Sequence, residues 1–132
     1  MSKFVRMFKP QFAPMVRAGT KLQTVRPMPK RMPKVGDHQS NREWTGKPYR
    51  SPQRVLCESM ITDVQTIQIT ETTLTTNGNR WSPAGVSLGM ETFAEQDGFE
   101  NWASLAAWFK TTHGLPFDGI VIHWEPLPKI NP

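Results

Sequence analysis

Residues 54–70, RVLCESMITDVQTIQIT, give the strongest strand signal in the chain and decide its fold class. The stretch is rich in Val, Ile and Thr, which favour extended backbone, and Ile61, Ile67 and Ile69 would share one face of an uninterrupted strand. Its length predicts one long bent strand or two shorter ones, with a bulge or a turn near residues 62–63. A β-sheet is therefore expected at the centre of the fold.

The chain before this stretch reads as strand, helix and strand. Residues 3–8 are β-prone, and residues 12–18 carry apolar side chains at a helical spacing that Gly19 is suited to end. Residues 22–26 return to strand character. The three prolines of residues 27–37 predict an irregular connector, because proline cannot continue a helix.

Residues 38–44 predict another extended segment, and residues 45–54, TGKPYRSPQR, a long basic loop. Asn77-Gly78 is a strong hairpin signal. Two helices should follow, over residues 88–96 and after the N-cap residue Asn101. The second helix would bury an apolar stripe made of Trp102, Leu105, Ala106 and Phe109.

Residues 117–125 predict a last strand. The order of the elements indicates a small α+β fold: a curved, mostly antiparallel β-sheet or barrel with flanking helices. We expect residues 1–132 to form a single domain, with a core over residues 3–125 and a loose tail over residues 126–132.

The composition narrows the function classes. No apolar run approaches the roughly 20 residues needed to span a bilayer and no signal peptide opens the chain, so we expect a cytoplasmic protein without a membrane partner. Cys57 is the single cysteine, which rules out an internal disulfide framework. The three histidines lack a paired metal-ligand spacing and no phosphate-binding glycine loop is present, so we expect no metal and no cofactor.

The net charge of +5 is unevenly distributed along the chain. Residues 1–54 hold 13 Lys or Arg against two acids, whereas residues 55–132 hold three against nine. This separation predicts one basic face, which favours a polyanionic or phosphorylated partner. The alternative is a basic loop that serves solubility alone.

The segment Gly19-Thr20-Lys21-Leu22-Gln23-Thr24-Val25-Arg26 fits the pattern G-x-K-x-x-T-x-R. In this pattern, and in the segments VGD (35–37), FAEQDGF (93–99) and GIVIHWE (119–125), the chain resembles the ASCH family, a branch of the PUA-like folds. The resemblance implies a PUA-like fold and a role connected with RNA or nucleotides.

Some small bacterial ASCH proteins are amidohydrolases that remove the acyl group from N4-acetylcytidine, using a lysine, a threonine and a glutamate. The resemblance carries these roles to Lys21, Thr24 and Asp97. Asp97 stands where those enzymes use glutamate and is one methylene shorter; Glu95 or Glu100 could compensate.

The residue types suit such chemistry. Thr24 offers a hydroxyl nucleophile, Lys21 a base, Asp97 a group that orients the lysine or handles the leaving-group proton, and Arg26 a donor to the substrate or an oxyanion. The alternative is that these residues have only structural roles. Thr24 would then be an ordinary strand residue and Lys21 a solvated turn residue, and Arg26 would form an ion pair with Asp97.

A second set of residues suits nucleic acid. Trp44 and Tyr49 could stack on unpaired bases or on a nucleoside, although Trp44 could equally pack in the core. The residues expected to neutralise phosphates are Lys30, Arg31, Lys34, Arg42, Lys47, Arg50 and Arg54.

The sequence thus predicts an ASCH-like protein that binds RNA or a nucleoside in a basic cleft, with hydrolysis of an N4-acylcytidine-like amide as its most concrete chemistry. A non-catalytic RNA-binding module and a ribonuclease are the alternatives.

Overall fold

A computed structural model describes residues 2–77, 79–81 and 83–128. They divide into two compact units, each described here by itself. The first unit contains residues 2–22, 33–63 and 123–128, and the second contains residues 23–32 and the described part of 64–122. Strands β4 (Gln53–Ile69) and β7 (Phe117–Pro126) contribute residues to both units.

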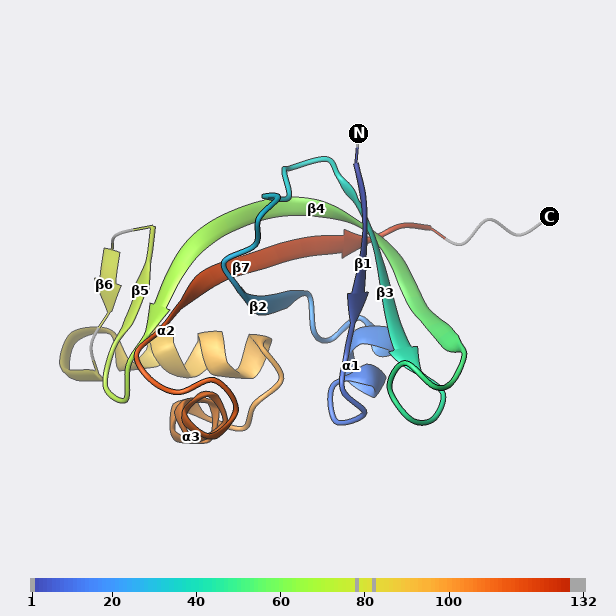
Figure 1. The fold of residues 1–132 in the computed structure, drawn as a ribbon. Helices are drawn as coiled ribbons and strands as arrows, with labels where there is room; N and C mark the ends of the chain where they lie inside the picture. Colours follow the sequence, from blue (N-terminus) through green and yellow to red (C-terminus); the bar gives the residue numbers. More distant parts are fainter. Residues whose placement is uncertain (1, 78, 82, 129–132) are drawn as a thin grey trace. The chain divides into compact units, whose positions relative to one another are not determined.

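In the first unit, β1 (Lys3–Met7) pairs in parallel with β3 (His38–Trp44), which pairs antiparallel with β4 (Figure 1). Helix α1 (Ala13–Ala18) follows β1 and has proline in its first turn, where no N–H is required. Gly19 ends the helix with a φ of +80°, and its N–H donates to the Val16 carbonyl. The predicted strand, short helix and glycine stop are confirmed.

Strand β4 is one continuous strand, and its irregularity lies earlier than expected. Asn41 is paired with Cys57 and Arg42 with Val55, so Leu56 has no partner residue across the ladder and forms a bulge. Of the predicted alternatives, one long strand is confirmed and a turn at residues 62–63 is wrong, because β4 runs through these residues without a break. In a regular strand, residues at even and odd positions point to opposite faces. The bulge interrupts this alternation, so Leu56 at an even position and Ile61 at an odd position are both buried.

The turn that leads into β3 is fixed by one carboxylate. Gly36 has a φ of +93°, and Asp37 accepts hydrogen bonds from the backbone N–H groups of Lys34 (2.9 Å) and Ser2 (3.1 Å). These bonds join the start of β1 to the start of β3. They also hold the pKa of the Asp37 carboxyl below its ordinary range, because an N–H donor stabilises the charged form.

In the second unit, β2 (Gln23–Pro27) pairs with β7, and β5 (Leu74–Thr76) lies antiparallel between β4 and β6 (Asn79–Trp81). The predicted hairpin is confirmed, with Asn77 at a φ of +47°; Gly78 lies outside the described residues. Helix α2 (Pro83–Gln96) begins five residues before the predicted start, at a proline, which suits a first helical position.

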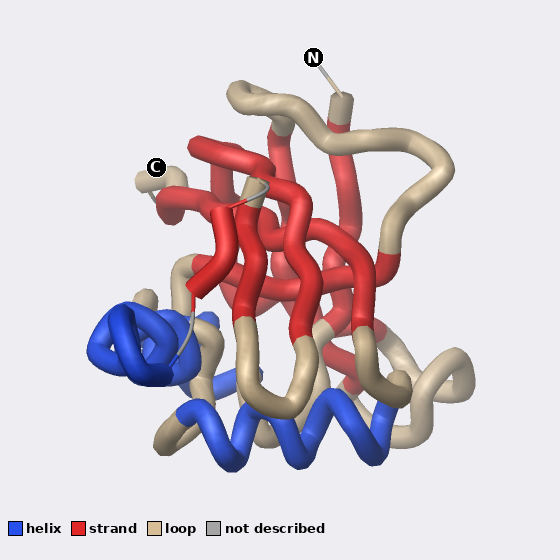
Figure 2. Tube along the Cα trace, turned by 90° about the vertical axis from the view of Figure 1, so that its left-hand side faces the viewer, coloured by secondary structure: helices blue, strands red, loops and turns tan. Residues whose placement is uncertain are grey.

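Helix α3 (Trp102–Thr112) begins where predicted, with the Asn101 side chain accepting a hydrogen bond from the Ser104 N–H at 2.8 Å. Helices α2 and α3 run crosswise: α3 is seen end-on in Figure 1 and from the side in Figure 2. The predicted apolar stripe of α3 is buried and joins the core of the second unit, whose other members include Val25, Ile67, Ile69, Leu74, Phe93 and Val121.

The fold is mixed α+β with a mostly antiparallel sheet, as predicted; β1 with β3 is a parallel pair. The sheet is not closed into a barrel, so that part of the prediction is wrong: β1 and β6 stand at the two ends of the strand order. Among the residues that the structure describes, no helix has the length and apolar character needed to cross a bilayer. Of the predicted loose tail, residues 129–132 lie outside the described residues.

Candidate functional site

Lys21 lies just past the end of α1, in the first unit, and only 3% of it is exposed. Its backbone N–H donates to the Met15 carbonyl at 3.1 Å, and its ammonium nitrogen lies 5.0 Å from the centre of the Phe12 ring. A cation over an aromatic face is stabilised by the ring quadrupole. Lys21 is therefore a buried lysine packed against an aromatic ring, and not the solvated turn residue of the structural alternative.

Thr24 and Arg26 lie on β2, in the second unit, and share a face of the strand as predicted. The Arg26 Nε donates to the Thr24 hydroxyl at 3.2 Å. Thr24 is 5% exposed, and Val25 between them points into the core of the unit. The guanidinium is thus close enough to stabilise negative charge that develops on the Thr24 oxygen.

Asp97 directly follows α2 and is 4% exposed. Its N–H continues the helical pattern to the Phe93 carbonyl at 3.0 Å, and the buried Gln23 amide donates to its Oδ1 at 3.4 Å. A buried carboxylate is costly unless it is hydrogen-bonded or paired, so its placement here is a specific feature of the fold. Glu95 and Glu100, the possible substitutes, are exposed.

Within the second unit, β2 thus takes part in two hydrogen-bonded pairs: Thr24 with Arg26 on the strand itself, and Gln23 with Asp97, which follows α2. Alternation along β2 puts Gln23 and Val25 on one face, and Thr24 and Arg26 on the other. Gln23 was missed at the level of sequence, because its contact with Asp97 joins positions 74 residues apart.

The predicted basic loop forms a compact turn in the first unit. Thr45 donates through its N–H (3.0 Å) and its hydroxyl (2.8 Å) to the Pro52 carbonyl, which closes the loop. Inside it, the Gly46 N–H donates to the Ser51 hydroxyl, and the Arg50 N–H donates to the Lys47 carbonyl. The loop is thus ordered by its own hydrogen bonds.

Tyr49 stands at the tip of this loop and is 88% exposed. Its backbone has a φ of +63°, in the left-handed region that residues other than glycine rarely adopt. The Tyr49 ring contacts the ring of Trp44, with centroids 5.0 Å apart and planes tilted by 48°. Trp44 is half-buried, so the two aromatic residues form one pair at the surface and Trp44 is not a core residue.

The cations near this pair differ in how they are engaged. Lys47 and Arg50 are exposed, and Arg54 donates through its Nε to Glu43 Oε2 at 3.2 Å. Arg17 of α1 donates to the same oxygen at 2.7 Å.

Arg42 donates to the Ser40 hydroxyl and to the Gln53 amide oxygen, each at 2.9 Å. The remaining predicted phosphate contacts lie on the connector after β2, where Lys30, Arg31 and Lys34 are all exposed. Lys30 and Arg31 belong to the second unit and Lys34 to the first.

A polar cluster on β3 and β4 was missed by sequence reasoning. Glu58 accepts from the Ser40 hydroxyl at 2.8 Å and contacts the Nε2 of His38. Burial alone would raise the pKa of Glu58, but the hydrogen bonds from His38 and Ser40 outweigh it and lower that pKa. In a catalytic triad the histidine lies between the serine and the acid. Here the Glu58 carboxylate lies between His38 and Ser40, so the cluster is not such a triad. The sequence signal that could have revealed this cluster is the spacing of His38, Ser40 and Arg42, because every second residue of a strand lies on the same face.

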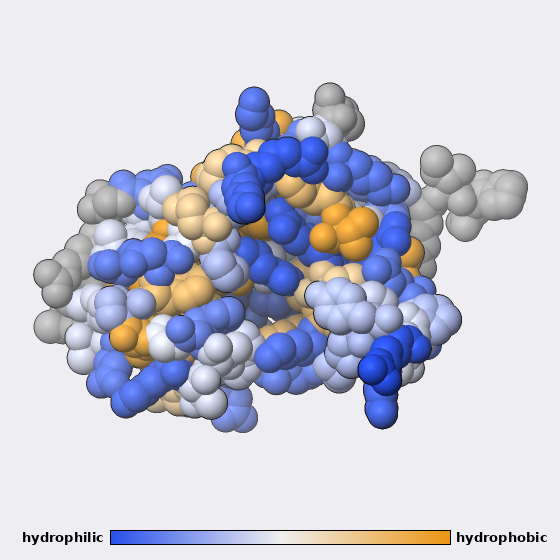
Figure 3. Space-filling view, viewed as in Figure 1, coloured by the Kyte–Doolittle hydropathy of each residue, from blue (hydrophilic) through white to orange (hydrophobic). Residues whose placement is uncertain are grey.

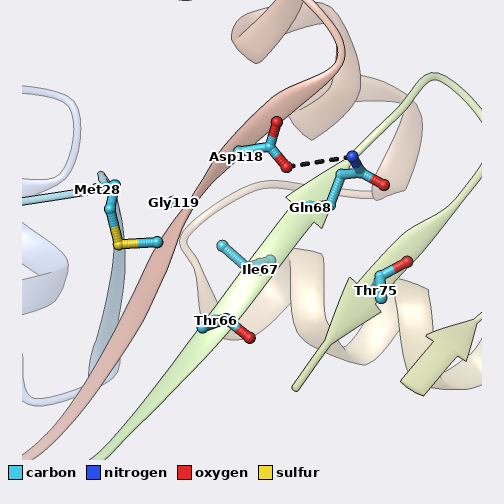
Figure 4. A pocket seen from close by; sticks show the side chains of 7 residues that line it. All are labelled: Met28, Thr66, Ile67, Gln68, Thr75, Asp118 and Gly119. Carbon is cyan, nitrogen blue, oxygen red and sulfur yellow. Dashed lines mark hydrogen bonds between the residues drawn. The ribbon is translucent and has the colours of Figure 1, made fainter. Parts of the chain in front are cut away.

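A shallow hollow of about 290 Å³ in the second unit was also missed (Figure 4). The Gln68 amide donates to Asp118 Oδ1 at 3.1 Å across its rim. Its lining residues are Met28, Thr66, Ile67, Gln68, Thr75, Asp118 and Gly119. The lining thus mixes hydrogen-bonding side chains with the apolar side chains of Met28 and Ile67.

Gly119, in this lining, explains how closely β2 and β7 approach. A Cβ there would collide with the Arg26 carbonyl oxygen and with the Phe117 ring. Within the part of the chain that the structure describes, no group of three His, Cys, Asp or Glu residues is placed to hold a metal ion.

The surface view in Figure 3 shows hydrophilic residues over most of the face drawn, with small apolar patches between them. Among the described residues, the most exposed large apolar side chains after Tyr49 are Val35 and Met28.

No family model and no curated protein matches this chain. Among solved structures, the chain is similar to the crystal structure of hypothetical protein PH0355. The TM-score is 0.56 at 12% sequence identity, over 95% of this chain and 99% of that one. At this identity the likeness shows the fold alone.

Proposed function

We propose that this chain is a PUA-like ASCH protein that binds RNA or a nucleoside and hydrolyses the amide of an N4-acylcytidine-like substrate. One observation carries the proposal. Lys21, Thr24 and Asp97, the residues that match the catalytic lysine, threonine and acid of the family, are all at most 5% exposed. Burying polar side chains costs free energy, so a fold that buries all three supports a specific use for them.

In this proposal the Thr24 oxygen attacks the acyl carbonyl carbon while Lys21, as a neutral amine, takes the hydroxyl proton. The proton then passes to the departing cytidine N4, and water hydrolyses the ester left on Thr24. Arg26 steadies the oxyanion, which its 3.2 Å hydrogen bond to the Thr24 hydroxyl supports.

The test is deacylation of N4-acetylcytidine by purified protein, followed by mass spectrometry. We expect wild type to release acetate, and Lys21→Ala and Thr24→Val to lose at least about 100-fold of the rate. Thr24→Ser, which keeps the hydroxyl, is the matched control and should retain activity. No deacylation by wild type, or equal rates for Thr24→Val and wild type, would refute the assignment.

A non-catalytic RNA-binding module is the second candidate, favoured by the surface pair of half-buried Trp44 and exposed Tyr49 and by the cations around it. Replacing Arg50 and Arg54 with glutamine should weaken binding of single-stranded RNA, measured by fluorescence anisotropy. Deacylation of free N4-acetylcytidine measured on wild type separates the two candidates. Shortening of the RNA on a gel would instead favour a ribonuclease.

A further inference from the structure

The loop over residues 45–52 exposes the aromatic ring of Tyr49, and the backbone of this residue is in an unfavourable conformation. Tyr49 has a φ of +63° and an 88% exposed side chain. A left-handed conformation is unfavourable for tyrosine, and burial of the ring does not offset it. Strained residues of this kind cluster at binding sites, where the surrounding structure holds them in place.

The surrounding structure is present here. The hydrogen bonds from Thr45 to Pro52 and between Gly46 and Ser51 fix the base of the loop. Trp44 supports the Tyr49 ring, with centroids 5.0 Å apart. The two rings already touch, so a flat ligand would stack on the outer face of Tyr49 and not between the rings. A ring held this way loses little conformational entropy on binding.

The charges beside the ring indicate a polyanion. Lys47 and Arg50 are exposed on the same loop. Arg54 and Arg17 are more than half exposed, and both donate to one oxygen of Glu43, whose side chain is 13% exposed. Because one carboxylate faces two guanidinium groups, the cluster keeps a net positive charge, but Glu43 competes with any phosphate for both arginines.

We propose that residues 44–54 form a pre-ordered platform for one unpaired base of single-stranded RNA, and that Glu43 limits its affinity by holding Arg54 and Arg17. The platform rests on the RNA-binding part of the proposed function and not on the hydrolytic part. The base stacks on Tyr49, and Lys47 and Arg50 contact the flanking phosphates. Because every base has an aromatic face, the platform tolerates different sequences, and because duplex bases are covered by their neighbours, it selects single strands.

Tyr49 is tested with a fluorescein-labelled oligouridylate of about eight nucleotides, by anisotropy. Tyr49→Asn keeps a residue that tolerates the left-handed conformation and removes the ring, and Tyr49→Phe keeps the ring. We expect Tyr49→Asn to weaken binding about tenfold without lowering the melting temperature, and Tyr49→Phe to bind as wild type. Equal affinity of Tyr49→Asn and wild type, or equal binding of duplex RNA or heparin by wild type, would overturn the platform.

Glu43 is tested with Glu43→Gln, and Glu71→Gln in the second unit is the control because it changes the net charge equally. We expect Glu43→Gln to bind the oligouridylate several-fold more tightly. Its salt dependence should steepen by about 0.7 for each phosphate newly contacted. Unchanged or weaker binding, or the same gain from Glu71→Gln, would refute the role of Glu43.

The two proposals fail separately. Deacylation of free N4-acetylcytidine by wild type, measured without RNA, decides the hydrolase alone. The binding curves of the Tyr49 and Glu43 variants decide the platform alone.

Discussion

Lys21, Thr24 and Asp97 are polar residues that are less exposed than several apolar members of the core, such as Val25. A motif residue on a turn or strand can be identified from sequence, but its burial depends on what packs over it. Sequence could therefore identify Lys21 and Thr24 as candidates. It could not reveal the ring of Phe12 beneath the lysine or the Gln23 amide beside Asp97.

Asp37 gives a prediction for pH dependence. Backbone hydrogen bonds from Lys34 and Ser2 lower its pKa in the folded chain below the ordinary value of 3.8. Its contribution to stability is therefore fully present above about pH 5 and is lost as the pH falls below 3.8 through the folded-state pKa. We expect Asp37→Asn to be less stable than wild type at pH 7, with a smaller loss on acidification, as measured by urea unfolding at several pH values. Parallel pH profiles for the two proteins would contradict this.

At the scale of elements, local patterns were sufficient for α1, the hairpin and α3. A glycine stop, a turn dipeptide and an N-cap each act within a few residues. The start of α2 was missed because Gly85 and Gly89 weaken the helical signal at its beginning. The bulge at Leu56 and the parallel pairing of β1 with β3 depend on partners distant in sequence, so no local pattern specifies them.

The pairing of β2 with β7 depends on one glycine. A Cβ at Gly119 would overlap the Arg26 backbone, so Gly119→Ala must push the two strands apart. We expect it to lower the free energy of unfolding by about 3 kcal/mol in urea titrations. Gly46→Ala is the control, because a Cβ there would lie at an ordinary 3.4 Å from the Ser51 side chain. Equal stability of Gly119→Ala and wild type would show that the strands can separate freely.

At the scale of the whole molecule, the two units share strands. Both β4 and β7 contribute residues to each unit, so separate unfolding would require two strands to be half extended and half disordered. We therefore expect one cooperative transition, even though the first unit and the second have their own buried side chains.

Phe109 and Cys57 test this cooperativity. Phe109 is 1% exposed in the second unit, and Phe109→Ala should lower the free energy of unfolding by about 3–5 kcal/mol. Cys57, the single cysteine, lies in the first unit and reports on it through its reactivity with a thiol reagent. We expect Phe109→Ala to lower the urea midpoint for Cys57 reactivity as much as the midpoint from circular dichroism. An unchanged Cys57 midpoint would show that the units unfold independently.

The charge asymmetry of the sequence predicts a basic face, but it does not predict which of the charges are paired with acids. Glu43 on β3 accepts hydrogen bonds from Arg17 on α1 and Arg54 on β4, which lie 26 and 11 positions away in the chain. These contacts depend on how the three elements pack, so no local pattern in the sequence predicts them.

The backbone of Tyr49 has a consequence for the history of this protein. Asn or Gly would occupy its left-handed conformation with less strain, so stability alone would select against tyrosine at this position. Descendants that no longer need the ring should lose it early, before they lose the turn that presents it. Retention of an aromatic residue at position 49 would then distinguish lineages that still use the loop from those that keep only its shape.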